Sequence, residues 1–99
     1  MVNVELQPRA EREARAAWRW YAKVSQSVAG RFASALDAAI AAIEANPSGQ
    51  APHLFSTRIV RLKGFPYILV FVEIAKDFMQ VVAVAHTSRR PAYWRRRLP

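Results

Sequence analysis

The chain of 99 residues contains no cysteine, which excludes disulfide bonds, thiolate zinc sites and cysteine nucleophiles. Glycine is also scarce, and the three glycines are too scattered to form a phosphate-binding loop. The two histidines, His53 and His86, have no cluster of further ligands near them in the sequence. We therefore expect neither a metal ion nor a cofactor.

Long hydrophobic runs are missing as well. The longest apolar segment, YILVFVEI at residues 67–74, has the length of a strand and contains Glu73, so it is too short to cross a bilayer. The N-terminal sequence MVNVELQPRAER has no basic segment followed by an apolar one, as a signal peptide would have. The sequence thus predicts a soluble, cytoplasmic protein that does not act at a membrane.

Acidic residues are few, and the charges are unevenly distributed. The formal net charge is +8. Residues 1–50 hold six Lys and Arg against five Asp and Glu, whereas residues 51–99 hold nine against two. A field this one-sided attracts polyanions or an acidic protein partner. With 53% hydrophobic residues, the chain is still expected to fold as one domain over residues 1–99.

The first half of the chain predicts one strand and two helices. Residues 2–7 alternate apolar and polar side chains, which is typical of a short, half-buried strand. From residue 9 to about 25, apolar residues recur at helical spacing. A second helix follows, with Ser27 as its expected N-cap, and ends at the NPSG sequence of residues 46–49. The short joint predicts an antiparallel helical hairpin.

The second half predicts a loop, three strands and a basic tail. Residues 50–56 are expected to form a loop, and strands are expected at 57–63, 67–74 and 79–86. The connections between the strands are short enough for hairpins, so the strands should run antiparallel. The order β-α-α-β-β-β predicts an α+β fold, with the helical hairpin packed on one face of a small, mainly antiparallel sheet.

Alternation along residues 57–63 predicts where two cations lie. If Val60 and Leu62 face the core beneath the helices, Arg61 and Lys63 point to the opposite, open face. The tail follows the last strand and can reach that face, so these cations and the tail arginines would form one concave basic surface. Alternatively, the strand cations only protect a sheet edge from unwanted pairing.

The closing segment AHTSRRPAYWRRRLP, residues 85–99, combines five arginines with one histidine and two aromatic residues. We expect Trp94 to pin the tail to the sheet, and Tyr93 either to do the same or to act chemically. His86 either hydrogen-bonds a neighbouring carbonyl or offers an imidazole. Because like charges repel, the chain beyond Trp94 is expected not to fold without a partner.

Three segments together resemble the RelE/ParE superfamily of toxins from bacterial toxin–antitoxin operons. They are WYA at 20–22, RLKGFPYILVFVE at 61–73 and HTSRRPAYWRRR at 86–97. The resemblance implies one of two activities: RelE-like members are ribosome-dependent endoribonucleases that cut mRNA, whereas ParE-like members are associated with poisoning of DNA gyrase. In both branches it also implies a small cognate antitoxin that wraps over the toxin.

The resemblance also implies which residues would work in a nuclease. A RelE-like site needs a base, an acid and cations that hold the charge on the phosphate. The matching residues are Arg61, Lys63, His86, Arg89 and Tyr93. However, RelE-like nucleases carry an arginine after the aromatic residue that begins the central strand, and here Tyr67 is followed by Ile68. The missing cation favours the ParE-like branch, with gyrase as target and mRNA on the ribosome as the alternative.

A ParE-like toxin would act by binding rather than by chemistry. The expected target-binding residues are Arg61, Lys63, Arg89, Arg90, Tyr93, Trp94, Arg95, Arg96 and Arg97. A third possibility is a non-toxic basic module that contacts nucleic acid through phosphates alone. On the first two interpretations, an acidic antitoxin segment neutralises the tail, and deletion of residues 89–99 is expected to abolish toxicity while leaving the rest soluble.

Overall fold

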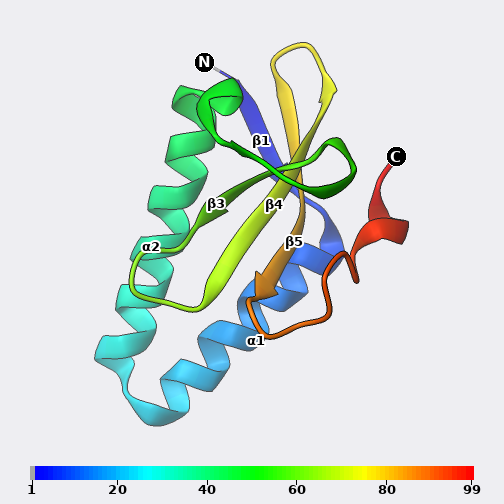
Figure 1. Ribbon diagram of the computed structural model, residues 1–99. Coiled ribbons are helices and arrows are strands. Elements are labelled where there is room, and N and C mark those ends of the chain that lie inside the picture. The colour runs from blue at the N-terminus through cyan, green and yellow to red at the C-terminus, as the bar shows by residue number, and fades with distance from the viewer. Residues whose placement is uncertain (1) are drawn as a thin grey trace.

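The computed structural model describes residues 2–99 and places two helices on one face of a five-stranded sheet, as Figure 1 shows. The sheet order is β1-β5-β4-β3-β2. The strands are β1 (Asn3–Leu6), β2 (Ala51–Pro52), β3 (Arg58–Arg61), β4 (Tyr67–Ala75) and β5 (Phe78–His86). The helices are α1 (Pro8–Val24) and α2 (Gln26–Ala45), with short 3-10 turns at Pro47–Gly49, Leu54–Ser56 and Arg95–Arg97. The α+β class and the predicted order of elements are confirmed.

The sheet is mainly antiparallel, as predicted, but it has one strand more than expected. Strand β1 pairs with β5 in parallel, and the other neighbours are antiparallel. The additional strand β2 lies inside the segment that we expected to be a loop, where Ala51 pairs with Ile59 and Pro52 with Arg58. Two residues are too few to show a period in the sequence, and a proline is tolerated here because β2 forms the edge of the sheet.

Helix α1 lies close to the sheet because the residues on its buried side are small. Pro8 stands in the first turn, where its missing N–H costs no hydrogen bond. Ala10, Ala14 and Ala17 recur at helical spacing and are buried against the sheet. Among residues 2–99, neither helix is long and apolar enough to cross a bilayer.

The joint between the helices is a single extended residue, Ser25, which ends α1 and caps α2. Its backbone N–H donates to the carbonyl oxygen of Tyr21, and its side-chain oxygen accepts from the N–H of Val28 at 3.3 Å. Ser27, the cap expected from the sequence, lies inside α2, where its hydroxyl accepts from Arg31 at 3.2 Å. Two serines so close together give the same local signal, and only the backbone conformation distinguishes them.

Substitution of the capping serine should therefore destabilise the protein more than substitution of its neighbour. We expect Ser25→Ala to lower the free energy of unfolding by about 1 kcal/mol, because the N–H of Val28 loses its partner. Ser27→Ala is the matched control and should change it by less than about 0.5 kcal/mol, as for other exposed positions. Urea denaturation measures both values, and the reverse order would show that Ser27 is the cap.

The larger hydrophobic core lies between the helices and the sheet. Its centre is a cluster of aromatic rings in which Phe32 of α2 is fully buried and Tyr21 of α1 stands 5.4 Å from it, centroid to centroid. Phe65 and Tyr67, from the β3–β4 hairpin, complete the cluster with edge-to-face contacts to both rings. This cluster fixes the hairpin, and with it the start of β4, against the helices.

A second core covers the opposite face of the sheet, which the sequence predicted to be open. Trp94 of the C-terminal tail is 2% exposed and packs on this face. The side chains of the sheet that it joins are Ile59, Ile68, Val70, Val82, Ala83 and Ala85. Burial on both faces explains why the central strand β4 is apolar on both sides. The helices do cover one face only, as predicted, but the tail covers part of the other.

Candidate nucleic-acid and protein interface

The C-terminal tail is folded on the protein itself, so the expectation that it would not fold beyond Trp94 without a partner is wrong. After β5 the chain turns back over the sheet, and Arg95–Arg97 form a 3-10 turn. The tail is held by the buried Trp94 ring and by polar contacts. These include an ion pair between Arg97 and Glu13 of α1 at 2.9 Å and a hydrogen bond from Nε2 of Gln7 to the carbonyl oxygen of Arg97 at 2.7 Å. The repulsion expected among the arginines is reduced, because Arg97 is neutralised by a carboxylate from another part of the chain.

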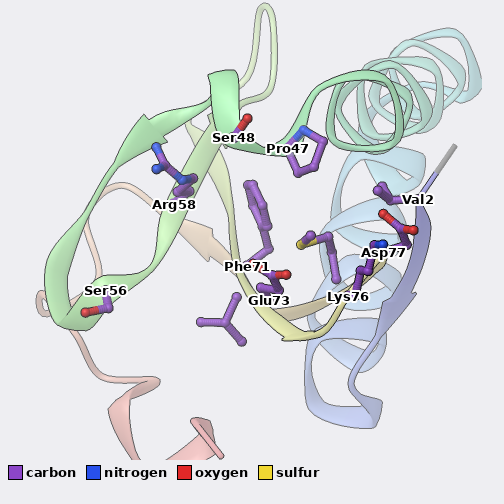
Figure 2. A pocket seen from close by; sticks show the side chains of 11 residues that line it. Val2, Pro47, Ser48, Ser56, Arg58, Phe71, Glu73, Lys76 and Asp77 are labelled. Atoms are coloured by element: carbon purple, nitrogen blue, oxygen red, sulfur yellow. The ribbon is translucent and has the colours of Figure 1, made fainter.

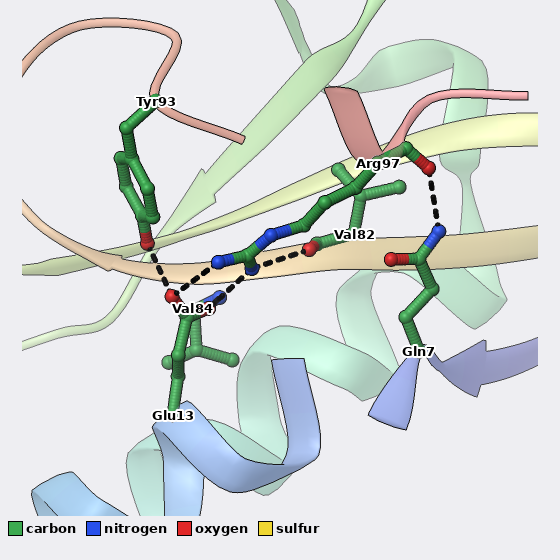
Figure 3. A network of polar contacts seen from close by, with 6 residues as sticks. All are labelled: Gln7, Glu13, Val82, Val84, Tyr93 and Arg97. Carbon is green, nitrogen blue, oxygen red and sulfur yellow. Dashed lines mark hydrogen bonds and ion pairs between the residues drawn. The ribbon is translucent and has the colours of Figure 1, made fainter. Parts of the chain in front are cut away.

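Glu13 is the centre of a polar network that fastens the tail to α1 (Figure 3). Its Oε2 atom accepts from the hydroxyl of Tyr93 at 2.7 Å and from Nη2 of Arg97 at 3.0 Å. Its Oε1 atom accepts from Nη1 of Arg97 at 2.9 Å. Because two parallel N–H groups meet two carboxylate oxygens, this ion pair is of the strong, bidentate kind.

The same network satisfies backbone groups of β5 beyond the end of β1. Strand β1 pairs only with the first part of β5, as far as Val81. Past that point the N–H of Val84 donates to Glu13 Oε1 at 3.0 Å, and the carbonyl oxygen of Val82 accepts from Arg97 at 3.0 Å. The side chains of Glu13 and Arg97 therefore take the place of a neighbouring strand. Their hydrogen bonds protect an otherwise exposed edge of the sheet.

Glu13 was not predicted as a site residue, because charges on a surface helix are usually solvated. One signal was present: Glu13 lies one residue before the buried Ala14 and four before Ala17, so it borders the buried face of α1. In a chain with few acids, a carboxylate beside the apolar face is a candidate partner for a buried cation.

The ring of Tyr93 in turn orients a further arginine. The guanidinium carbon of Arg89 lies 3.9 Å from the centroid of the Tyr93 ring, and that of Arg97 lies 5.2 Å from it. Similarly, the guanidinium of Arg95 lies over the ring of Phe55 at 4.3 Å. A guanidinium stacked on an aromatic face keeps its N–H groups available for a ligand in the plane of the group.

An open hollow of about 230 Å³ lies between this tail and the exposed end of the sheet. We call it the basic groove. It is lined by His53, Ile59, Arg61, Ile68, Ala85, His86, Thr87 and residues 89–94. It brings Arg61 of β3 together with Arg89 and Arg90 of the tail, although these residues are far apart in the sequence. Arg61 faces the groove because it alternates with Val60, which packs toward the helices.

A second hollow, of about 450 Å³, continues from the groove along the tail. We call it the tail hollow, and it is lined by Arg90, Ala92, Tyr93, Arg95 and Arg96. The two hollows share Arg90, Ala92 and Tyr93, so they form one continuous surface.

Two of the candidate target-binding residues lie elsewhere. Strand β3 ends at Arg61, so the alternation does not extend to Lys63, which lies in the turn before Gly64, a residue with a φ of +84°. Lys63 lines a different hollow, beside Arg31 of α2 and Phe65. Arg97 has its guanidinium on Glu13 and does not line the groove or the tail hollow. The prediction that Arg61 and Lys63 lie together on one surface is therefore wrong.

The candidate catalytic groups are arranged for structural contacts. Nδ1 of His86 accepts from the backbone N–H of Ser88 at 3.0 Å and lies 2.7 Å from its hydroxyl oxygen, whereas a bond to a carbonyl was expected. Burial raises the pKa of Tyr93 well above its usual value, and the hydrogen bond to Glu13 raises it further. At neutral pH the Tyr93 hydroxyl is thus protonated and donates a hydrogen bond to Glu13. Ile68 lines the groove where RelE-like nucleases have an arginine.

A hollow of about 450 Å³ at the other end of the sheet differs in charge (Figure 2). Its apolar floor includes Phe71, and its charged lining residues are Arg58, Glu73, Lys76 and Asp77. The two positive and two negative side chains cancel, so this hollow does not extend the basic surface. Within residues 2–99, no three His, Asp or Glu side chains lie close enough together to hold a metal ion.

A known protein family matches this chain. The family model described as "ParE toxin of type II toxin-antitoxin system, parDE" matches residues 4–91, which is most of the chain. The matched segment includes both helices and all five strands except Asn3, the first residue of β1, and it ends before Tyr93 and Trp94. No curated protein matches the chain.

Proposed function

The chain belongs to the ParE toxin family of type II toxin–antitoxin systems, and from this premise we propose that it arrests growth by binding DNA gyrase. The basic groove is the binding surface in this proposal. The observation that supports it best is the convergence of Arg61, Arg89 and Arg90 on one open hollow whose remaining wall includes apolar Ile68. A surface that combines arginines with apolar side chains is suited to a protein target.

Binding, rather than cleavage of RNA, fits the chemistry of the groove. A RelE-like reaction needs a group that accepts the 2′-hydroxyl proton and cations beside the scissile phosphate. The Tyr93 hydroxyl is held by Glu13 with a raised pKa, and Ile68 supplies no charge where the nuclease branch has an arginine. Cleavage of mRNA on the ribosome is therefore the alternative function, and primer extension distinguishes it from binding of gyrase.

The proposed antitoxin partner carries an acidic, partly apolar segment that lies over the basic groove. Such a segment would neutralise the positive charge concentrated in residues 51–99 and shield Arg89, which is exposed. We also propose that residues 1–99 act as one domain. In support, the two hydrophobic cores use opposite faces of the same sheet, and the second core includes tail residues beyond the family match.

Gyrase supercoiling assays with the purified protein test this proposal. We expect the protein to inhibit supercoiling. Arg89→Ala should raise the concentration for half-inhibition about 30-fold, because loss of a central interface arginine typically reduces the binding free energy by about 2 kcal/mol. Arg12→Ala removes the same charge from an exposed position on α1, away from the groove, and should leave inhibition nearly unchanged.

Two results would contradict the proposed function. Normal supercoiling at saturating protein would exclude gyrase as the target. Primer extension on translated mRNA after brief induction tests the alternative: codon-dependent cuts that disappear in Arg89→Ala would establish an mRNA endonuclease instead.

A further inference from the structure

The arginines of the basic groove and the tail hollow are not neutralised by the protein itself. Five of them are exposed: Arg61, Arg89, Arg90, Arg95 and Arg96. The two ion pairs within residues 2–99 are Arg15 with Glu11, and Arg97 with Glu13. None of the five therefore has an acidic partner in the described part of the chain, although the hollows place them side by side.

Holding these five cations close together destabilises the folded protein, because like charges repel one another. The Glu13 network and the buried Trp94 fix the tail on which four of the five lie. Two of them, Arg89 and Arg95, are further oriented by stacking on Tyr93 and Phe55. Five exposed arginines on two adjoining open hollows, two of them with oriented guanidinium groups, suit a phosphate backbone, because each guanidinium can bind a phosphate through two N–H donors.

The aromatic rings beside these arginines distinguish duplex from single-stranded nucleic acid. Single strands are bound mainly by stacking their bases on exposed aromatic faces. Here Trp94 is buried, Tyr93 has Arg89 and Arg97 against its ring, and Phe55 has Arg95 over its ring. The ring of His53 lies 6.0 Å from that of Trp94. The basic groove and the tail hollow thus offer phosphate contacts and little room for base stacking, although Phe55, which lines neither hollow, is 47% exposed.

We propose that the basic groove and the tail hollow together bind the phosphate backbone of duplex DNA. This inference rests on the proposed function and deepens it: what the basic groove meets in the complex of gyrase with DNA is the DNA that the enzyme holds. Binding is independent of sequence, because the contacts are made to the backbone. With five phosphate contacts, the logarithm of the binding constant falls with the logarithm of the salt concentration with a slope of about −4.5.

Fluorescence anisotropy with a short labelled duplex of arbitrary sequence tests this inference over a range of salt concentrations. The double substitution Arg95→Ala and Arg96→Ala removes two contacts and should reduce the steepness of the slope by about 1.8. Arg12→Ala with Arg19→Ala removes the same charge from exposed positions on α1 and should keep the slope of the unchanged protein. Thermal unfolding of each variant verifies that the fold is retained.

Single-stranded DNA and RNA of the same sequence form the other arms of the experiment. We expect both to bind at least tenfold more weakly than the duplex, because the aromatic faces are occupied. Binding of a single strand as tight as that of the duplex would overturn the inference, as would equal slopes for the two double variants. Inhibition of gyrase without duplex binding would overturn it and leave the proposed function intact. Duplex binding with normal supercoiling would support the phosphate contacts but exclude the proposed function, and with it the contact to DNA held by gyrase.

Discussion

Replacement of Trp94 by alanine is expected to lower the free energy of unfolding by about 3–5 kcal/mol. The side chain is 2% exposed and is the largest member of the second core, where it covers Val70 and Val82 of the sheet. Its removal leaves a cavity that the flat face of a sheet cannot fill by a small movement. A domain of this size is stable by only about 5–15 kcal/mol, so the variant should be marginal at physiological temperature.

Urea denaturation measures this effect, with Trp94→Phe as the control. Phenylalanine keeps most of the apolar volume, so it should lose less than half as much stability as alanine. A loss below about 1 kcal/mol in Trp94→Ala would show that the tail is not part of the core. For the same reason, deletion of residues 89–99 should not leave a soluble fold, because it exposes the apolar face that Trp94 covers. The deletion that was predicted from the sequence to leave a soluble protein is therefore unsuitable as a test of toxicity.

Glu13→Gln is expected to lower the free energy of unfolding by about 2–4 kcal/mol, because it leaves Arg97 without a counter-charge in a mostly buried position. The side chains of Arg97 and Glu13 are only 12% and 18% exposed. Glutamine has nearly the same shape but one acceptor oxygen, so it cannot serve Tyr93, Arg97 and the N–H of Val84 at once. Because this network fixes the tail, the variant should also inhibit gyrase less than the unchanged protein.

The matched control is Glu11→Gln, two residues earlier on the same helix. Glu11 pairs with Arg15 on the exposed side of α1, with side chains 50% and 63% exposed, so its loss should cost less than about 1 kcal/mol. A double-mutant cycle with Arg97→Gln isolates the ion pair: the double variant should be clearly more stable than the sum of the single effects predicts. Additive effects would contradict direct coupling between Glu13 and Arg97.

The elements of the fold could be predicted because their signals are local. The period of α1 was predicted from Ala10, Ala14, Trp18 and Tyr21, all within one helix. Ala10 and Ala14 are buried and Tyr21 packs against the core, whereas Trp18 is 40% exposed. The end of α2 was similarly marked by Asn46 before a proline, and the helix ends at Ala45. Where two local signals competed, as for Ser25 and Ser27, no local pattern distinguishes the capping residue from its neighbour.

The basic groove was only partly predictable. Arg61 was placed on the correct face because the alternation of β3 extends that far, and Lys63 was misplaced because the strand ends two residues earlier. The folded tail was not predictable, since its arginines repel one another locally. Glu13, which neutralises Arg97, lies 84 residues away along the chain.

The sequence by itself determined the α+β architecture, the excess of positive charge in the second half and the resemblance to a toxin family. These properties follow from periodicity, composition and local motifs, which act over a few residues. Only the tertiary structure decided which cations are free and which are bound. That depends on the distance between charges from remote segments, because a carboxylate within hydrogen-bonding reach turns a repelling arginine into an anchor. Arg97 became such an anchor, and Arg61, Arg89 and Arg90 remained available for a ligand.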